Sequence, residues 1–221
     1  MCASALFAGL TPHECNEIAS CARVRTFARD EILFAQGDPN RNMTMLLSGS
    51  VKLTQISSGG NEVLLWMSGR GDAVNVSSES DTCGHSCSAK AVEQCRAMVW
   101  EYSRLQSMLD QYPQIRNNIN RILASRLNEL EERFREVATE KAAKRLAQTL
   151  TRLLKQVGKT SIDGVQVSLS REELAQMTGT TLFTISRILS KWAGQGFVVP
   201  RREAVVVKSQ KMLELAMNQD E

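Results

Sequence analysis

The chain has 221 residues, of which 43% are hydrophobic and 23% are charged, and its net charge is +3. These proportions are ordinary for a globular protein with room for two modest domains. No apolar run reaches membrane-spanning length, and residues 1–10 lack the features of a secretion signal, so we expect a cytoplasmic protein. Residues 139–221 hold 13 Lys+Arg against 8 Asp+Glu, whereas the preceding residues hold 14 against 16, which favours a nucleic-acid contact in the last part.

The first part of the chain consists of short apolar or alternating runs separated by glycine turns. A short helix is expected near residues 11–22, before the first run. The runs that we interpret as strands are Arg23–Phe27, Glu31–Phe34, Met43–Leu47, Ser50–Gln55 and Glu62–Met67. Short strands at this spacing favour an antiparallel barrel or roll. Such folds commonly enclose a pocket for one small ligand, so we predict a sensor domain here.

A long amphipathic helix is predicted next, from Gln114 to about Ala138. Apolar residues recur in it at steps of three and four, with charged residues between them. They are Ile115, Ile119, Ile122, Leu123, Leu127, Leu130, Phe134 and Val137. Helices packed on their own domain show the same pattern, but the length and polar flanks of this one favour a dimer contact.

The segment Leu169–Lys191 carries the signals of a helix-turn-helix. Ser170 followed by Glu173 forms a capping box, and Leu169 and Leu174 occupy the positions of a hydrophobic staple, so the first helix should begin at Arg171. The glycine at position 179 suits the left-handed backbone of a sharp turn between helices.

The second helix of this motif is expected from about Thr180 to Ala193. Its buried side is marked by Ile185, Ile188, Leu189 and Trp192. The other face brings together Leu182, Phe183, Ser186, Arg187 and Ser190. Such a helix can enter the major groove of DNA, where Arg187 can donate two hydrogen bonds to a guanine edge. Two short helices joined by glycine are also a common packing motif.

A β-hairpin is predicted directly after this helix, which ends at residues 194–196. Phe197–Val199 and Ala204–Val207 are the predicted strands, and the turn between them carries Arg201 and Arg202. Adjacent arginines at a hairpin tip suit phosphate, so the hairpin is interpreted as the wing of a DNA-binding domain.

Five segments spread along the chain match the pattern of a known family. They are Glu31–Asp38, Leu47–Leu53, Gly71-Asp72, Arg145–Leu150 and Leu169–Leu189. With these segments in this order, the chain resembles the cyclic AMP receptor protein and fumarate–nitrate reductase regulator (Crp/Fnr) family. The resemblance implies an α+β fold with an antiparallel β-roll (1–112), a dimerisation helix (113–138) and a winged helix-turn-helix (139–221). It further implies a homodimeric transcription regulator that is switched by a small signal. The implied partners are palindromic double-stranded DNA, a second copy of the chain and RNA polymerase, and no association with a membrane is expected.

The segment after Gly71-Asp72 departs from the family members that bind cyclic AMP. Those members hold the ribose and the phosphate with a Gly-Glu and an Arg-Ser pair, because an anionic phosphodiester needs arginine. Here residues 73–78 lack Gly-Glu, and the arginine position falls on or near His85. Leu130 and Glu131 stand where the cyclic AMP receptor has hydroxyl residues that meet the base. We therefore predict that cyclic AMP is not the ligand.

The same region instead contains Cys83-Gly84-His85-Ser86-Cys87. Thiolate and imidazole suit zinc, iron or haem iron, and cysteine is also redox-active. The segment is similar to the Cys-x-His-Ser element of the haem-bearing carbon monoxide regulator of the family, which implies Cys83 and His85 as alternating haem ligands. The N-terminal proline that opposes the haem in that relative is absent here. A solvated loop and a Cys83–Cys87 disulfide are the alternatives, so the cofactor, haem or another metal, stays open.

Other cofactors and activities find less support. An iron–sulfur cluster is disfavoured because Cys2, Cys15 and Cys21 form no close triplet, and Cys15 and Cys95 are expected to fill the core. We see no phosphate loop, zinc-protease histidine pair or Ser/His/Asp arrangement, so we do not expect an enzyme. A constitutive DNA-binding protein without a ligand and, less favoured, a metal-dependent β-roll enzyme stay as alternatives.

The expected DNA contacts lie on the helix-turn-helix and the wing. Phosphate contacts are expected at the starts of both helices, where the helix dipole favours anions; these residues are Ser170, Arg171, Thr180 and Thr181. Arg187 matches the guanine-reading arginine of the family, and Ser186 a base-contacting serine. Phe183 replaces a glutamate that accepts from cytosine in many members, and it can pack on a thymine methyl or be buried in its own domain. The predicted surface is completed by Leu182, Lys191, Arg201 and Arg202.

Overall fold

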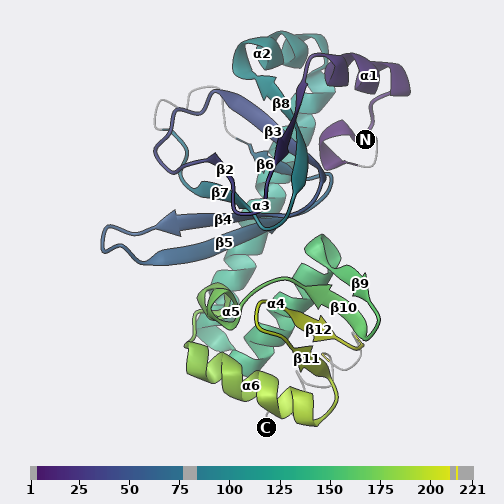
Figure 1. Ribbon diagram of the computed structural model, residues 1–221. Coiled ribbons are helices and arrows are strands. Elements are labelled where there is room, and N and C mark those ends of the chain that lie inside the picture. The colour runs from purple at the N-terminus through teal and green to yellow at the C-terminus, as the bar shows by residue number, and fades with distance from the viewer. Residues whose placement is uncertain (1–3, 77–83, 210–212, 214–221) are drawn as a thin grey trace. The chain divides into compact units, whose positions relative to one another are not determined.

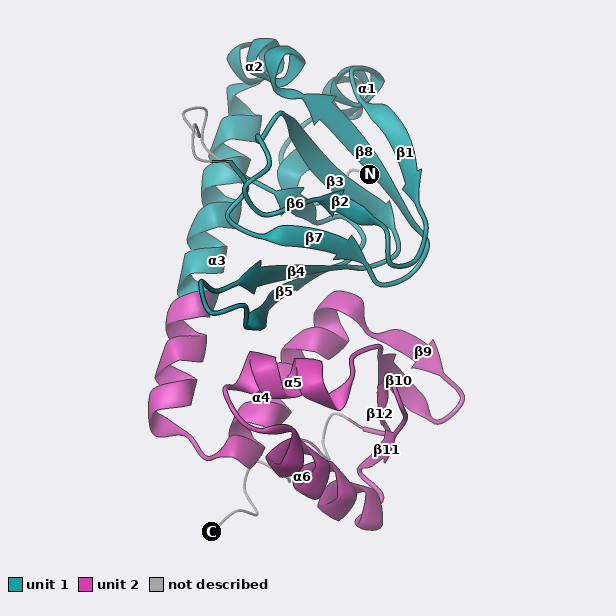
Figure 2. Ribbon diagram, turned by 60° about the vertical axis from the view of Figure 1, so that its left-hand side comes forward, with its two compact units in different colours: residues 1–129 teal, residues 130–221 magenta. Residues whose placement is uncertain are grey.

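The computed structural model describes residues 4–76, 84–209 and 213 of the chain. It divides into two compact units, residues 1–129 and 130–221 (Figure 2). Each unit combines an antiparallel sheet structure with helices, which confirms the predicted α+β class (Figure 1). Among the described residues, no helix is long and apolar enough to cross a membrane.

The first unit contains the predicted β-roll, built from two four-stranded antiparallel sheets. Their strand orders are β1-β8-β3-β6 and β2-β7-β4-β5. The strands are β1 (Arg23–Phe27), β2 (Ile32–Phe34), β3 (Asn42–Ser48), β4 (Val51–Ile56), β5 (Glu62–Ser68), β6 (Ala73–Asn75), β7 (Ser88–Ala91) and β8 (Cys95–Glu101). The five strands predicted from the sequence are confirmed to within one residue at each end, whereas β6, β7 and β8 were not predicted.

The roll closes tightly where β3 turns into β4. Gly49 adopts a φ of +83°, and a Cβ atom placed there would lie 2.6 Å from the Cys95 sulfur. Cys95 is fully buried and its thiol donates to the Ser50 carbonyl oxygen at 3.2 Å. Cys15 is also fully buried, so the prediction that both cysteines fill the core is confirmed.

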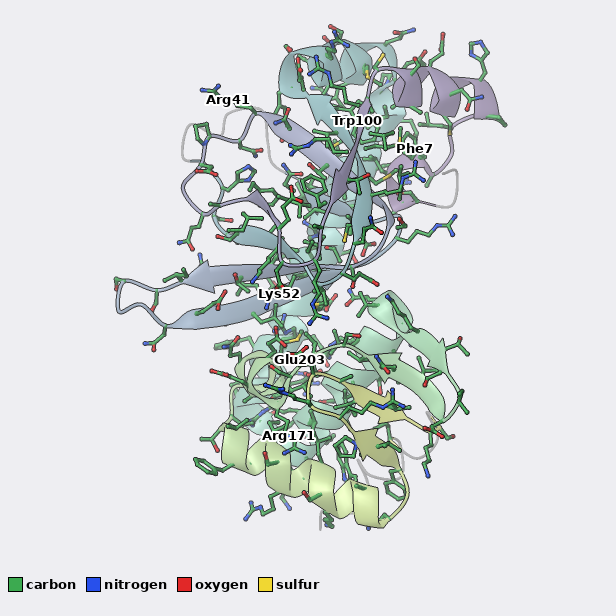
Figure 3. All side chains as sticks on the ribbon, viewed as in Figure 1. Phe7, Arg41, Lys52, Trp100, Arg171 and Glu203 are labelled. Carbon is green, nitrogen blue, oxygen red and sulfur yellow. The ribbon has the colours of Figure 1, made fainter. Side chains whose placement is uncertain are left out.

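The helices of the first unit enclose a second part of its core. They are the short 3₁₀ helix η1 (Ala5–Phe7), α1 (Pro12–Ser20), α2 (Tyr102–Gln111) and the first part of α3 (Pro113–Thr139). Buried Trp100 on β8 packs against Phe7, with ring centroids 6.2 Å apart (Figure 3), and its indole N–H donates to the Ile18 carbonyl oxygen at 2.8 Å. The buried Asn118 amide of α3 donates to the Leu6 carbonyl oxygen at 2.9 Å, which ties α3 to the N-terminal segment.

The second unit contains a helix-turn-helix and a four-stranded antiparallel sheet of order β11-β12-β10-β9. Its elements are α4 (Ala142–Val157), β9 (Lys159–Ser161), β10 (Gly164–Val167), α5 (Arg171–Thr178), α6 (Leu182–Gly194), β11 (Val198–Pro200) and β12 (Val205–Val207). The predicted wing hairpin is present as β11 and β12, and β10 pairs with β12. The wing is therefore one half of a sheet that also includes the unpredicted hairpin β9–β10.

A buried ion pair joins the last turns of α3 to α4 within this unit. Glu136 is only 3% exposed, and its two carboxylate oxygens accept from the Arg152 guanidinium at 2.5 and 2.8 Å. Arg152 also donates to the Thr149 hydroxyl at 3.3 Å. The C-terminal part of α3 is thereby fixed to the helix-turn-helix unit.

Candidate nucleic-acid interface and sensor site

The first helix of the predicted motif, α5, begins at Arg171, as its capping box and hydrophobic staple predicted. The Ser170 hydroxyl accepts from the Glu173 backbone N–H at 3.2 Å, and the Glu173 carboxylate accepts from the Ser170 backbone N–H at 2.8 Å. Leu169 and Leu174 are both buried, as a hydrophobic staple requires. Because the Ser170 hydroxyl also donates to Glu173, it is occupied by the cap. Arg171, labelled in Figure 3, is exposed beside it and is the better placed of the two for a phosphate.

The turn between α5 and α6 is held by side chains from other helices. Gly179 has the predicted left-handed conformation, with φ at +59°. The Arg145 guanidinium of α4 donates to the carbonyl oxygens of Thr178, at 2.8 Å, and Gly179, at 3.3 Å. Arg133 of α3 donates to the Met177 carbonyl oxygen at 3.4 Å. These arginines stabilise the carbonyl end of α5 and fix the turn, a role that was not predicted from the sequence.

The second helix begins two residues later than predicted. Thr181 is the N-cap and its hydroxyl accepts from the Thr184 backbone N–H at 3.2 Å, so the helix starts at Leu182 and not at Thr180. The capping threonine was visible in the sequence, and it explains the shift. The predicted buried side is confirmed, since Ile185, Ile188, Leu189 and Trp192 are all buried.

The opposite face of α6 is open to solvent. Leu182, Phe183, Arg187 and Lys191 are exposed, and Ser186 is half-buried. Phe183 is 84% exposed, so the alternative that it is buried in its own domain is wrong. An arginine, a lysine, a serine and two apolar side chains thus share one face of a helix whose other face is anchored in the core.

The two arginines of the wing turn have different surroundings. Arg201 donates to the Gln166 side-chain oxygen at 2.8 Å and lies 3.5 Å from the Asp163 carboxylate, both on the neighbouring hairpin. Arg202 is exposed at the same turn. Because the charge of Arg201 is partly offset by Asp163, Arg202 is the stronger candidate for a phosphate contact.

The predicted sensor loop is packed against the turn after β2. The backbone N–H of His85 donates to the Asp38 carbonyl oxygen, and its carbonyl oxygen accepts from the Gly37 N–H, both at 2.8 Å. The His85 ring stacks on Phe34, with centroids 3.9 Å apart and planes 19° from parallel. Cys83, the proposed partner of His85, lies outside the described residues. Among the residues that are described, no group of three or more His, Cys, Asp or Glu is placed to hold a metal ion.

A partly buried arginine of α3 lies among polar groups of the roll. Arg126 donates to the Ala73 carbonyl oxygen, and the Asp72 carboxylate and the Cys87 thiol are its electrostatic neighbours. Burial lowers the pKa of Arg126 and raises the pKa of both Asp72 and Cys87. The raised pKa keeps Cys87 in the thiol form at neutral pH, which is the less reactive form. In the sequence, Arg126 is one of the charged residues between the apolar positions of α3. This cluster was not predicted, because only the fold brings Arg126 to the roll.

The predicted dimer stripe of α3 divides into two parts. Ile115 and Ile119 are buried in the core of their own unit, which leaves them little surface for another chain, so the prediction that these two residues meet a partner is corrected. Ile122 and Leu123 are only partly buried against that core, and their contact with a partner stays a prediction. The exposed part of the stripe consists of Leu127, Leu130, Phe134 and Val137.

A roll followed by a long helix and a winged helix-turn-helix defines a class of two-part DNA-binding proteins, and comparison with known proteins agrees. Residues 24–112 match a cyclic nucleotide-binding domain and residues 144–216 a Crp-like helix-turn-helix domain. The cyclic AMP receptor protein of Thermus thermophilus is 30% identical over 96% of this chain and 95% of its own. A cAMP-activated global transcriptional regulator of Mycobacterium tuberculosis is 25% identical over 94% of each chain.

Solved structures give the same fold. The global regulator CLP of Xanthomonas campestris superposes with a TM-score of 0.74 at 24% identity, covering 90% of this chain and all of that one. The chain belongs to the Crp/Fnr family and is a DNA-binding transcription regulator, not an enzyme.

Proposed function

We propose that this regulator acts as a homodimer that reads a palindromic DNA site through α6, under the control of a signal sensed in the β-roll. The observation that carries the proposal is the open face of α6, which presents Arg187 and Lys191 while the opposite face is anchored by Trp192 and its neighbours. Arg187 donates two hydrogen bonds to a guanine edge in the major groove. Arg171 and Arg202, with the N-terminus of α6, bind the phosphates on either side.

A second copy is expected to join along the exposed part of α3. Leu127, Leu130 and Phe134 are large apolar side chains at helical spacing, and Phe134 is 77% exposed. A solvent-exposed apolar stripe of this kind is stabilised when an identical helix covers it. The dimer presents two α6 helices to half-sites about 34 Å apart, or a multiple of it. RNA polymerase, a typical partner of this family, is proposed as the further contact, in the cytoplasm.

The proposed signal is not cyclic AMP. The partly buried cation that the fold brings to the roll is Arg126. It already donates to the Ala73 carbonyl oxygen and has Asp72 as an electrostatic neighbour, so its charge is offset before any phosphate arrives. A phosphodiester needs an arginine that is free to pair with it. The described part of the sensor loop contains the imidazole of His85, which suits axial ligation of a haem. Among the described residues no three or more His, Cys, Asp or Glu side chains are grouped as a closed zinc site requires. We therefore propose haem sensing through Cys83 and His85. Redox sensing through Cys83, His85 and Cys87 is the second candidate, and the raised pKa of Cys87 disfavours it.

The DNA proposal is tested by selecting binding sites for the full chain from a random duplex pool. We expect a palindrome with a preferred guanine in each half-site. Arg187→Ala should weaken binding by about 1–3 kcal/mol and relax the preference at that guanine. Lys155→Ala, which removes a charge from the exposed end of α4, serves as the control and should leave the preference unchanged. Selected sites without a preferred guanine would refute the proposal.

The signal is tested by an absorption spectrum and metal analysis of the full chain purified without oxygen. A Soret band that shifts with carbon monoxide or nitric oxide, and that is lost in His85→Ala, supports haem sensing. A colourless, metal-free protein whose DNA binding responds to mild oxidation supports redox sensing. DNA binding that is unchanged by gas and by oxidant contradicts both and favours a constitutive regulator.

A further inference from the structure

Two large apolar side chains are exposed at the start of α6, where they do not serve the core of their own unit. Phe183 is 84% exposed and Leu182 is 44% exposed, in a helix whose buried side is already filled by Ile185, Leu189 and Trp192. The helix start itself is completed by the hydroxyls of Thr181 and Thr184, which lie 3.0 Å apart. Neither Leu182 nor Phe183 is therefore needed to cap or to pack this helix.

The position of Phe183 places it beside the guanine-reading side chain. Phe183 and Arg187 are four residues apart in α6, on the same face and about 6 Å apart along the helix axis. In DNA-reading helices the N-terminal residues reach the base edges. A rise of about 3.4 Å per base pair means that Phe183 falls one or two base pairs from the guanine contacted by Arg187.

We infer that Phe183 makes this protein select a thymine one or two base pairs from that guanine, an inference that rests on the proposed DNA reading by α6. A phenyl ring neither donates nor accepts a hydrogen bond, and the C5-methyl of thymine is the one apolar group that a base pair presents in the major groove. A guanine or cytosine edge at this place would lose its hydrogen bonds to water when the ring covers it, and the ring offers no hydrogen bond in return. Leu182 extends the apolar surface of Phe183 and excludes water from the same base pair.

The experiment removes only the methyl group. A site selected from a random pool is resynthesised with deoxyuridine in place of each thymine in turn, and binding of the full chain is measured by fluorescence anisotropy at fixed salt. Burial of one methyl group corresponds to roughly a fourfold change in affinity. We expect one thymine per half-site whose replacement weakens binding by about fourfold, and about fifteenfold when both half-sites are changed.

The same substitutions in Phe183→Ala show whether the ring is responsible. In this variant, deoxyuridine at the sensitive position should have no further effect, because the partner of the methyl is gone. Ile162→Ala removes a fully exposed apolar side chain from the β9–β10 turn and should keep the fourfold sensitivity. Loss of methyl sensitivity in the Ile162 variant would contradict the assignment.

The outcomes separate this inference from the proposed function. Guanine preference that depends on Arg187, without a methyl-sensitive thymine or with a sensitivity that persists in Phe183→Ala, overturns the inference alone. Absence of any selected site, or of any effect of Arg187→Ala, overturns the proposed function itself.

Discussion

Replacing Glu136 by glutamine is expected to loosen α4 strongly while leaving the shape of the side chain almost unchanged. The Glu136 carboxylate is buried and takes two hydrogen bonds from Arg152, whose side chain is 25% exposed. Breaking one partner of a buried pair typically costs 3–5 kcal/mol, because the remaining charge stays buried without compensation. The partial exposure of Arg152 lets water reach its guanidinium, so we expect about 3 kcal/mol, at the lower end of that range.

Native-state hydrogen exchange of the full chain, read by mass spectrometry on peptides of α4, measures this loss. A loss of about 3 kcal/mol corresponds to roughly a hundredfold fall in protection. Glu132→Gln on the same helix breaks an exposed pair with Arg135 and is the matched control, for which little change is expected. Peptides from β8 in the other unit should keep their protection in both variants.

The double variant Glu136→Leu with Arg152→Met tests the reasoning behind this magnitude. Replacing both charges by apolar groups of similar volume removes the uncompensated charge, so protection should return close to that of the wild type. Unchanged α4 protection in Glu136→Gln, or a double variant less protected than the single one, would refute the argument from burial.

Further predictions concern the dimer, the turn and the sensor region. Phe134→Ser should shift the dimer towards monomer in sedimentation velocity, whereas Phe183→Ser, the same change on α6, should not. Equal sedimentation of the two variants would contradict the α3 interface. Gly179→Ala should lower stability by about 1–2 kcal/mol in thermal unfolding, because a side chain disfavours the left-handed φ of +59° there; an unchanged Tm would contradict it. Cys87 should react slowly with iodoacetamide at pH 7.5, because burial raises its pKa above the ordinary value of 9.0 and the thiolate becomes abundant only at higher pH. Rapid labelling of the Cys87 peptide at neutral pH would instead favour thiol-based redox sensing.

Local signals predicted the second unit well because they act over a few residues. The capping box of Ser170 and Glu173 and the glycine at 179 fixed the limits of α5, and the structure places both as expected. The two-residue error at α6 arose because the capping role of Thr181 was not recognised. The hairpin β9–β10 was also missed, although Asp163-Gly164 between short β-prone runs is a recognised turn signal.

Contacts between distant segments explain what could not be predicted. Periodicity marked the apolar face of α3 correctly, but it could not say that the N-terminal segment and α2 would bury Ile115 and Ile119. The hydrogen bond from Arg145 to the Thr178 carbonyl oxygen joins residues 33 positions apart. The hydrogen bond from Arg126 to the Ala73 carbonyl oxygen joins residues 53 positions apart. Such pairs follow from the fold, and an arginine on a polar helix face gives no sign of them beforehand.

Recombination between relatives would meet a constraint inside α3. A natural crossover point for exchanging one sensor domain for another is the end of this helix at Thr139, because a non-helical link follows it before α4 begins at Ala142. A crossover there would keep Arg152 and the α5–α6 turn but take Glu136 and Arg133 from a foreign chain. A DNA-binding segment that can be inherited or transplanted as a working whole must therefore begin before Arg133. In a chimaera joined after that point, the foreign chain must itself supply the carboxylate that pairs with Arg152.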